Sequence, residues 1–322
     1  MVLPLGGRVG RRQRKKQKYA PGSQCRPGLS VFIPLFALLG PDQAALMAPD
    51  NSSFFNPLYY TTQEDVQNLL EAYVARFNTV DFIPSDPISI PHLFSKKQDI
   101  EISAFWTAML SWGQRKTILK SAGQLFERMD FAPHDFICNH QEKDRIRLSE
   151  FKHRTFQPED TYYFLDFLQW YYRQCDSLET GFAQFITPGA PHVEEALAGF
   201  HDLFFSMPYA PLRTKKHIPT PKRGSTCKRM NMFLRWMVRK DDKGVDFGLW
   251  DTIRPSQLLI PLDVHVERIA RRLGLLTRAQ VDWAAVLELN NRLRNFDPED
   301  PVKYDFALFG LGVLEKSEHG RA

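Results

Sequence analysis

Apolar residues recur at helical spacing along almost the whole chain from Met47 onward, and this periodicity is what most constrains the fold. Within 158–186 aromatic and acidic residues alternate at helical spacing, and strand-like alternation with a period of two is almost absent along the chain. Helices are expected at 61–77, 99–110, 118–126, 158–186, 193–205, 228–239, 263–273, 277–294 and 301–314. The first is expected to open at Thr61-Thr62, with Glu64 as a capping-box-like acid. The sequence therefore predicts an all-α fold.

Residues 206–226 form the clearest boundary in the chain. Four prolines, Pro208, Pro211, Pro219 and Pro221, crowd this segment. Proline removes a backbone donor and clashes inside a helix, so the segment is expected to be non-helical. We predict a helical region over 48–205, a Pro-rich basic linker over 206–226 and a second helical region over 227–322.

The first 47 residues differ in composition from the rest. They carry eight Lys or Arg against Asp42 alone, whereas the net charge of the whole chain is only +5. The remainder therefore sums to about −2, so a nucleic-acid surface on the body must be local. A 12-residue apolar run, 29–40, follows the basic cluster. Three interpretations stay open: a true start at Met47, a basic arm, or an export or membrane signal.

The cysteines and the lengths of the apolar runs bear on localisation. The four cysteines lie far apart, and no C-x-x-C pair occurs. This spacing argues against a zinc ribbon, a cysteine-ligated cluster or a dense disulfide framework, and it fits a reducing compartment. No apolar run approaches the ~20 residues that a membrane span needs. We expect a cytoplasmic monomer with no metal and no cofactor.

A basic segment follows the Pro-rich stretch. Between Arg213 and Lys240 there are ten Lys or Arg and no Asp or Glu. Such a density favours a phosphate backbone as partner, because bound cations release counterions from nucleic acid. The alternative is a solvated face that is balanced by acids from elsewhere in the chain. The residues of this segment that we predict to contact DNA are Lys215, Lys216, Lys222, Arg223, Arg229 and Arg235.

The run 260–275, IPLDVHVERIARRLGL, has the features of a capped helix. Asp263 stands where an N-cap is expected, Val266, Ile269 and Leu273 share one face, and Gly274 follows as a stop. This run resembles the segment that carries the catalytic aspartate in helix-hairpin-helix DNA glycosylases. The resemblance implies that Asp263 is the catalytic acid, while an ordinary helix cap is the alternative.

The run 224–229, GSTCKR, opens an amphipathic helix with Lys228 opposite its apolar face. Because no Leu-Pro-Gly-Val-Gly hairpin is present, the chain looks most like the archaeal 8-oxoguanine branch of these glycosylases. It also resembles a bacterial family of uncharacterised proteins. The resemblance implies a two-lobed helical fold with a cleft, and a Schiff-base lysine at Lys228. Cationic neighbours and the helix dipole would favour loss of its proton; Lys243, beside two acids, is the rival nucleophile.

The function that the resemblance implies is excision of a damaged base from double-stranded DNA, with or without strand cleavage at the abasic site. Four residues of the turn at 111–116 are further candidates: Trp112 for the base and Gln114, Arg115 and Lys116 for DNA. Trp236 and Trp250 are candidates for stacking on an extruded base, although aromatic residues at helical spacing are more often core.

Two alternative functions stay open. One is a nucleic-acid-binding protein without enzymatic activity on a glycosylase-like scaffold. The other is a metal-dependent phosphohydrolase, for which the doublets His134-Asp135 and His201-Asp202 are the only signal.

Overall fold

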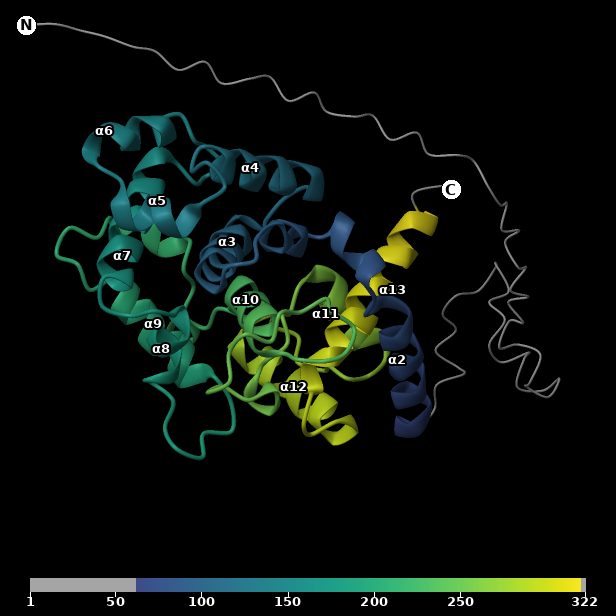
Figure 1. Ribbon diagram of the computed structural model, residues 1–322. Coiled ribbons are helices and arrows are strands. Elements are labelled where there is room, and N and C mark those ends of the chain that lie inside the picture. The colour runs from purple at the N-terminus through teal and green to yellow at the C-terminus, as the bar shows by residue number, and fades with distance from the viewer. Residues whose placement is uncertain (1–61, 320–322) are drawn as a thin grey trace, which may run out of the picture. The chain divides into compact units, whose positions relative to one another are not determined.

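The computed structural model describes residues 62–319, which are helical with no β-strand (Figure 1). The predicted all-α fold is thus confirmed. The α-helices are α2 (Gln63–Phe77), α3 (Lys97–Leu110), α4 (Arg115–Glu127), α5 (Pro133–Asn139), α6 (Glu142–Arg145), α7 (Pro158–Tyr172), α8 (Leu178–Ala183), α9 (Glu194–Phe204), α10 (Lys228–Val238), α11 (Val264–Arg272), α12 (Trp283–Phe296) and α13 (Tyr304–His319).

Short 3₁₀ turns connect many of these helices. They are η3 (Val80–Ser85), η4 (Pro87–Ser89), η5 (Pro91–Leu93), η6 (Ile146–Leu148), η7 (Leu212–Lys216), η8 (Pro221–Arg223), η9 (Pro255–Gln257) and η10 (Pro301–Lys303). Six of the eight contain proline, whose fixed φ suits the first position of such a turn. The expected helix over 158–186 is two helices, α7 and α8, and the one expected from 277 begins at Trp283. The predictions for residues 1–47 concern a stretch outside the described residues.

Helix α2 begins at a capping box, as the sequence suggested, but with a different acid. The Thr62 side chain accepts a hydrogen bond from the Asp65 backbone N–H (3.1 Å), and the Asp65 carboxylate accepts one from the Thr62 N–H (3.1 Å). We expected Glu64 in this role. Asp65 takes it because it occupies the third position of the helix, from which a side chain reaches back to the cap.

Helix α3 lies at the centre of the described region, and every residue from Ile100 to Leu110 is buried. It packs against α4 on one side and α10 on another (Figure 1). A helix that is covered all round needs no polar face. Its one buried carboxylate, Glu101, accepts hydrogen bonds from the hydroxyls of Tyr172 and Ser177, from the Leu178 N–H and from the Trp250 indole. These contacts join α3 to α7, α8 and the loop after α10.

The segment 206–226 is non-helical apart from η7 and η8, as its prolines predicted. Ile218 and Thr214 within it are fully buried, so it packs into the body of the protein. The carboxylate of Asp160 on α7 holds it in place, accepting hydrogen bonds from Thr214 (2.7 Å) and Arg213 (2.7 Å). Residues 206–226 are therefore a buried connection between the α3–α9 helices and α10.

Helix α2 packs along α13, so the first and last described helices are neighbours (Figure 1). The contact is close at Gly310, where an added Cβ would lie 2.2 Å from the ring of Phe77. The Gln67 side chain donates to the Phe296 carbonyl (3.1 Å), and Tyr304 donates to Glu71 (2.6 Å). Residues about 230 positions apart thereby form one side of the core.

This packing predicts opposite effects for two glycine-to-alanine substitutions. Gly310→Ala should lower the free energy of unfolding by roughly 1–3 kcal/mol, because the Phe77 ring must shift to admit the methyl group. Gly123→Ala, on α4 with no atom within 4 Å of the added Cβ, should be neutral or stabilising by up to about 1 kcal/mol. Urea denaturation of both variants measures this, and equal stabilities would contradict the α2–α13 packing.

Candidate functional site

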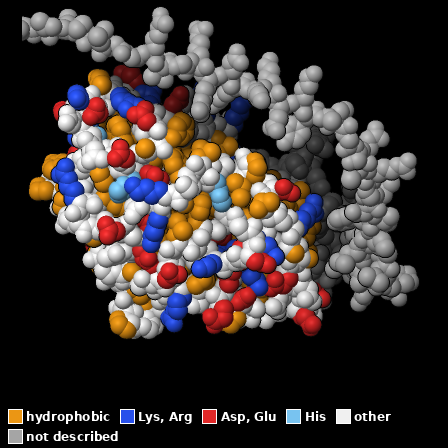
Figure 2. Space-filling model, in the orientation of Figure 1, with side chains coloured by type: hydrophobic (Ala, Val, Ile, Leu, Met, Phe, Trp, Pro, Cys, Tyr) orange, Lys and Arg blue, Asp and Glu red, His pale blue; other side chains and the backbone are white. Residues whose placement is uncertain are grey.

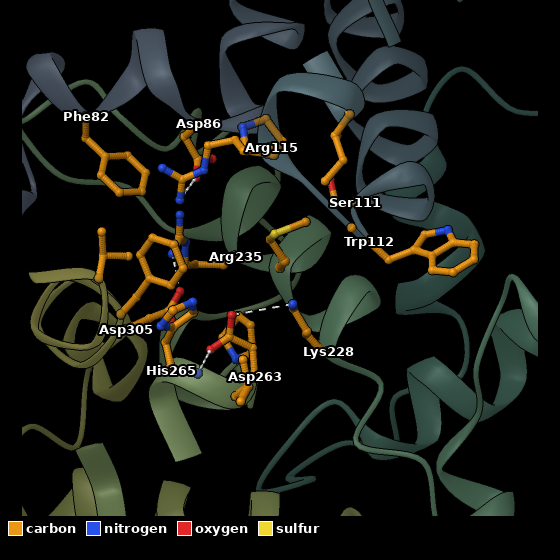
Figure 3. Close-up of a pocket in the computed structure, with 18 of the residues that line it drawn as sticks. Phe82, Asp86, Ser111, Trp112, Arg115, Lys228, Arg235, Asp263, His265 and Asp305 are labelled. Carbon is orange, nitrogen blue, oxygen red and sulfur yellow. Dashed lines mark hydrogen bonds and ion pairs between the residues drawn. The ribbon is translucent and has the colours of Figure 1, made fainter. Parts of the chain in front are cut away.

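Lys228 and Asp263 lie side by side although 34 residues separate them in the sequence. The Lys228 Nζ is 3.4 Å from the Asp263 Oδ2 (Figure 3). The lysine side chain is 37% exposed and the aspartate side chain 10% exposed. The pair is therefore accessible from solvent through the lysine, while the carboxylate is largely enclosed.

The start of α10 is fixed by an unusual backbone conformation. Cys227, the residue before Lys228, has a φ of 49°, in the left-handed region that non-glycine residues rarely adopt. Its N–H donates to the Ser225 hydroxyl (3.2 Å), and its side chain is buried. Burial raises the pKa of the Cys227 thiol to about 12, so this cysteine stays protonated and serves packing. The strained residue sets Lys228 as the first residue of the helix.

The two oxygens of Asp263 have separate roles. Oδ1 accepts hydrogen bonds from the backbone N–H groups of His265 (2.8 Å) and Val266 (2.9 Å), which caps α11. Oδ2 is the oxygen that faces Lys228. Asp263 therefore both caps α11 and faces Lys228, because its two carboxylate oxygens point to different partners.

A cavity of about 780 Å³ opens beside this pair. Its walls come from η3 and η4, from the turn 111–114 and the start of α4, and from α10, α11 and α13 (Figure 3). Phe82, Ile118, Met232, Phe306 and Phe309 give it an apolar side. This volume falls within the range of small-molecule and cofactor sites, roughly 300–1,000 Å³.

The wall of the cavity also holds buried charges that sequence reasoning missed. Asp305, on the first turn of α13, receives a charged hydrogen bond from Arg235 of α10. Burial raises the pKa of Asp305 to about 7; Arg235 opposes this shift, and the nearby Asp263 adds to it. Asp86 faces Arg115 at 3.8 Å, and burial raises its pKa too. Neither acid stood in a motif, and only the fold brings them to the cavity.

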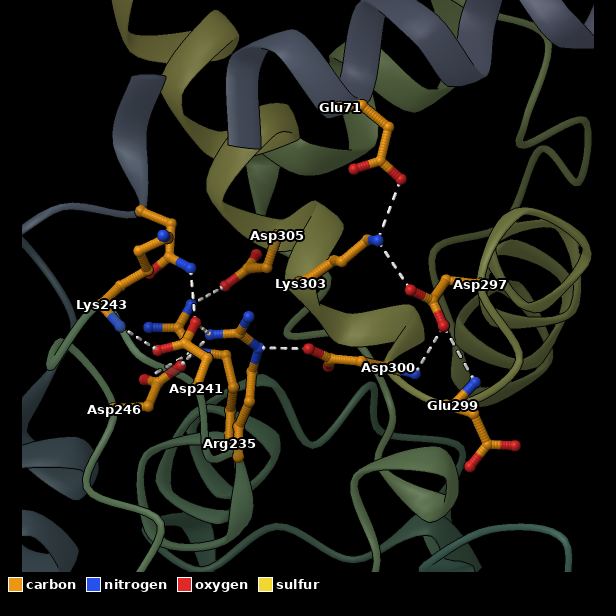
Figure 4. Close-up of polar contacts among 12 residues, drawn as sticks. Glu71, Arg235, Asp241, Lys243, Asp246, Asp297, Glu299, Asp300, Lys303 and Asp305 are labelled. Atoms are coloured by element: carbon orange, nitrogen blue, oxygen red, sulfur yellow. Dashed lines mark hydrogen bonds and ion pairs between the residues drawn. The ribbon is translucent and has the colours of Figure 1, made fainter. Parts of the chain in front are cut away.

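Arg235 is the centre of a buried ion network behind the cavity (Figure 4). Its guanidinium also donates to Asp246 (3.2 Å), which in turn accepts from Arg239 (3.2 Å). Arg239 continues the network to Asp300 (2.8 Å). The network links α10 to the loop that follows it, to the start of α13 and to the turn before η10.

The basic segment between Arg213 and Lys240 is largely balanced inside the protein. Half of its ten cations form ion pairs with acids from elsewhere: Arg213, Lys222, Lys228, Arg235 and Arg239. Arg229 donates instead to the backbone carbonyls of Met109 and Lys216. On the face drawn in Figure 2, basic and acidic side chains are intermixed. Besides Arg229, the cations of the segment without an ion pair in residues 62–315 are Lys215, Lys216, Arg223 and Lys240.

The other predicted site residues divide between the cavity and the core. Gln114, Arg115 and Trp112 line the cavity, and Lys116 is exposed on the first turn of α4. Trp236 and Trp250 are buried in the core, away from it. Lys243, the rival nucleophile, pairs with Asp242 (3.0 Å) on an exposed turn and does not line the cavity.

The two His–Asp doublets stand apart from any metal-type cluster. Within residues 62–315, no three His, Cys, Asp or Glu side chains lie together in a way that could hold an ion. His201 contacts its own neighbour Asp202 (3.3 Å), and His134 contacts Lys96 (2.8 Å).

In the part of the chain that is described, no helix is both long and apolar enough to cross a bilayer.

Fold and site together define an all-α protein with a lysine–aspartate pair at a cavity. A family model described as "Protein of unknown function (DUF2400)" matches residues 86–314, well over half of the sequence, and the chain belongs to this family. The matched range includes every cavity residue except Phe82. No curated protein and no solved structure matches the chain.

The buried position of Arg235 predicts a large loss of stability on its replacement. Arg235→Met removes the only cation within residues 62–315 that contacts Asp305 and leaves that buried carboxylate uncompensated. We expect a loss of roughly 3–5 kcal/mol in urea denaturation. Arg147→Met, which breaks an exposed pair with Asp130, is the control and should change little. Equal effects would show that the network contributes no more than a surface pair.

The geometry of Asp263 makes a second prediction, for the cap alone. Asp263→Asn keeps an oxygen that accepts from His265 and Val266, so its thermal unfolding should match the parent. Asp263→Ala loses both bonds and should cost about 1 kcal/mol. If Asp263→Asn unfolds at as low a temperature as Asp263→Ala, it is the charge facing Lys228 that stabilises α11, and not the cap.

Proposed function

We propose that this protein is a DNA glycosylase that removes a damaged base, with strand cleavage at the abasic site as a further step. The observation that carries the proposal is the pairing of Lys228 and Asp263 at 3.4 Å beside the cavity. The resemblance of residues 260–275 and 224–229 to the active-site segments of helix-hairpin-helix glycosylases supports the same pair.

The chemistry follows from the two side chains. Lys228 Nζ attacks C1′ of the deoxyribose, so that an N–C1′ bond forms as the bond from C1′ to the base breaks. Asp263 Oδ2 is the nearest acceptor for the proton that the amine loses, and that proton leaves with the base. Opening of the sugar ring at C1′–O4′ then gives a Schiff base. The carboxylate also stabilises positive charge that develops on the sugar.

The cavity suits a nucleobase turned out of its helix. An enzyme that acts on a base must extrude it from the stack into a pocket. The aromatic side chains of Phe82, Phe306 and Phe309 offer apolar area, and Gln114 and Arg115 offer hydrogen-bond donors. DNA itself would be held by surface cations, of which the exposed Lys116, Lys216, Lys222 and Arg223 and the half-buried Lys215 are the candidates. Arg229 and Arg235 contribute to packing in this proposal, because their guanidinium groups are engaged inside the protein.

Borohydride trapping tests the proposal directly. Duplex oligonucleotides that carry oxidised, alkylated, deaminated or abasic sites are incubated with the protein and borohydride, which reduces a Schiff base to a stable covalent complex. Lys228→Gln should abolish trapping and keep most of the DNA affinity. The matched control is Lys243→Gln, an exposed lysine outside the cavity, which should trap like the parent.

Asp263→Asn supplies the second arm of the same experiment. It keeps the cap but lacks the charge, so single-turnover base release should fall by two decades or more, about 3 kcal/mol in the barrier. Parental protein that binds damaged DNA but neither traps nor releases base would identify a binding protein without this activity. Trapping that survives Lys228→Gln would place the nucleophile elsewhere.

A further inference from the structure

Arg154 stacks on Trp112, a residue of the cavity wall. The guanidinium carbon of Arg154 lies 4.5 Å from the centre of the indole ring, a cation–π distance. Trp112 lines the cavity, and Figure 3 shows its indole pointing away from Lys228 and Asp263. Arg154 is exposed and forms no ion pair within residues 62–315. A cation is therefore presented to solvent on Trp112, a residue of the cavity wall, and no acid of the described region pairs with it.

The backbone of Arg154 is strained. Its φ is 55°, in the left-handed region, where a residue with a Cβ is disfavoured. The surrounding contacts impose this conformation. His153 and Phe156 exchange backbone hydrogen bonds (3.0 and 2.9 Å), the Arg154 carbonyl accepts from Gln157 (3.1 Å), and the Thr155 carbonyl accepts from Arg213 (3.2 Å). Strain that is held by so many contacts is characteristic of functional positions.

Gly113 is matched to the same arginine. Its φ is 110°, and an added Cβ would lie 2.7 Å from the Arg154 Nη1. The glycine therefore provides the space in which the guanidinium rests on Trp112. His153 supports the indole from its edge, with ring centres 6.3 Å apart. Burial lowers the pKa of His153, so this imidazole is neutral at pH 7 and does not repel the guanidinium.

We propose that Arg154, held on Trp112, binds a backbone phosphate of the nucleic-acid strand whose nucleotide enters the cavity. This inference rests on the proposed function, to which it adds a contact residue. A guanidinium with one face on an aromatic ring keeps its N–H edge free, and that planar edge matches two phosphate oxygens. The tryptophan then serves to orient the arginine.

The test measures affinity for a duplex with a tetrahydrofuran abasic-site analogue at several salt concentrations. Arg154→Gln should bind about tenfold more weakly, and the slope of log affinity against log salt should decrease by about 0.9, the loss of one phosphate contact. Arg154→Lys should keep the slope and lose part of the affinity. Arg173→Gln, an exposed arginine at the end of α7 outside the cavity, is the matched control and should leave both unchanged.

Arg154→Gly separates binding from folding. Glycine tolerates the left-handed conformation, so this variant should melt at or above the parental temperature and still bind as weakly as Arg154→Gln. A lower melting temperature with a parallel loss of affinity would overturn the inference and assign Arg154 a structural role.

The parental protein distinguishes the two proposals. If it traps on damaged DNA while Arg154→Gln binds with parental affinity and slope, the inference on Arg154 is wrong and the proposed function stands. If it neither binds nor traps, both fall together.

Discussion

The site depends on the ion pairs of a buried arginine, Arg235. Its guanidinium contacts Asp246 and Asp305, two carboxylates that are themselves buried, and this fixes α10 against α13. Because Lys228 and Arg235 are two turns apart on one helix, the position of the lysine over the cavity follows from where the arginine is anchored. The ion network therefore holds α10 in the position that brings Lys228 to Asp263.

The sequence predicted best what depends on neighbours in the chain. The amphipathic helices α10 and α11 begin within a residue of the expected positions, because apolar spacing and the Asp263 cap are local signals. The all-α fold follows from the same periodicity. The Thr62 capping box differed only in its acid, and the break between α7 and α8 was missed, because aromatic spacing continues across it.

Long-range charge pairing was beyond sequence reasoning. The density of cations between Arg213 and Lys240 suggested an external anion, yet acids from outside the segment form ion pairs with half of them. Several of those acids, such as Asp160 and Asp300, stand in no motif. The position of Lys228 beside Asp263 was expected from the resemblance, whereas Asp86 and Arg154 carried no recognisable pattern. Their relation to the cavity comes from turns whose positive φ angles and 3₁₀ geometry depend on tertiary contacts.

The contact between α2 and α13 has a consequence for how the chain is made. Synthesis proceeds from the N-terminus, so α2 emerges from the ribosome long before its partner exists. Its apolar face, with Val66, Leu70 and Val74, stays uncovered until α13 has been translated. This side of the core can form only once α13 has left the ribosome. Folding of this side of the core is therefore delayed. Chains truncated before α13 expose the apolar face of α2, which favours chaperone binding or proteolysis.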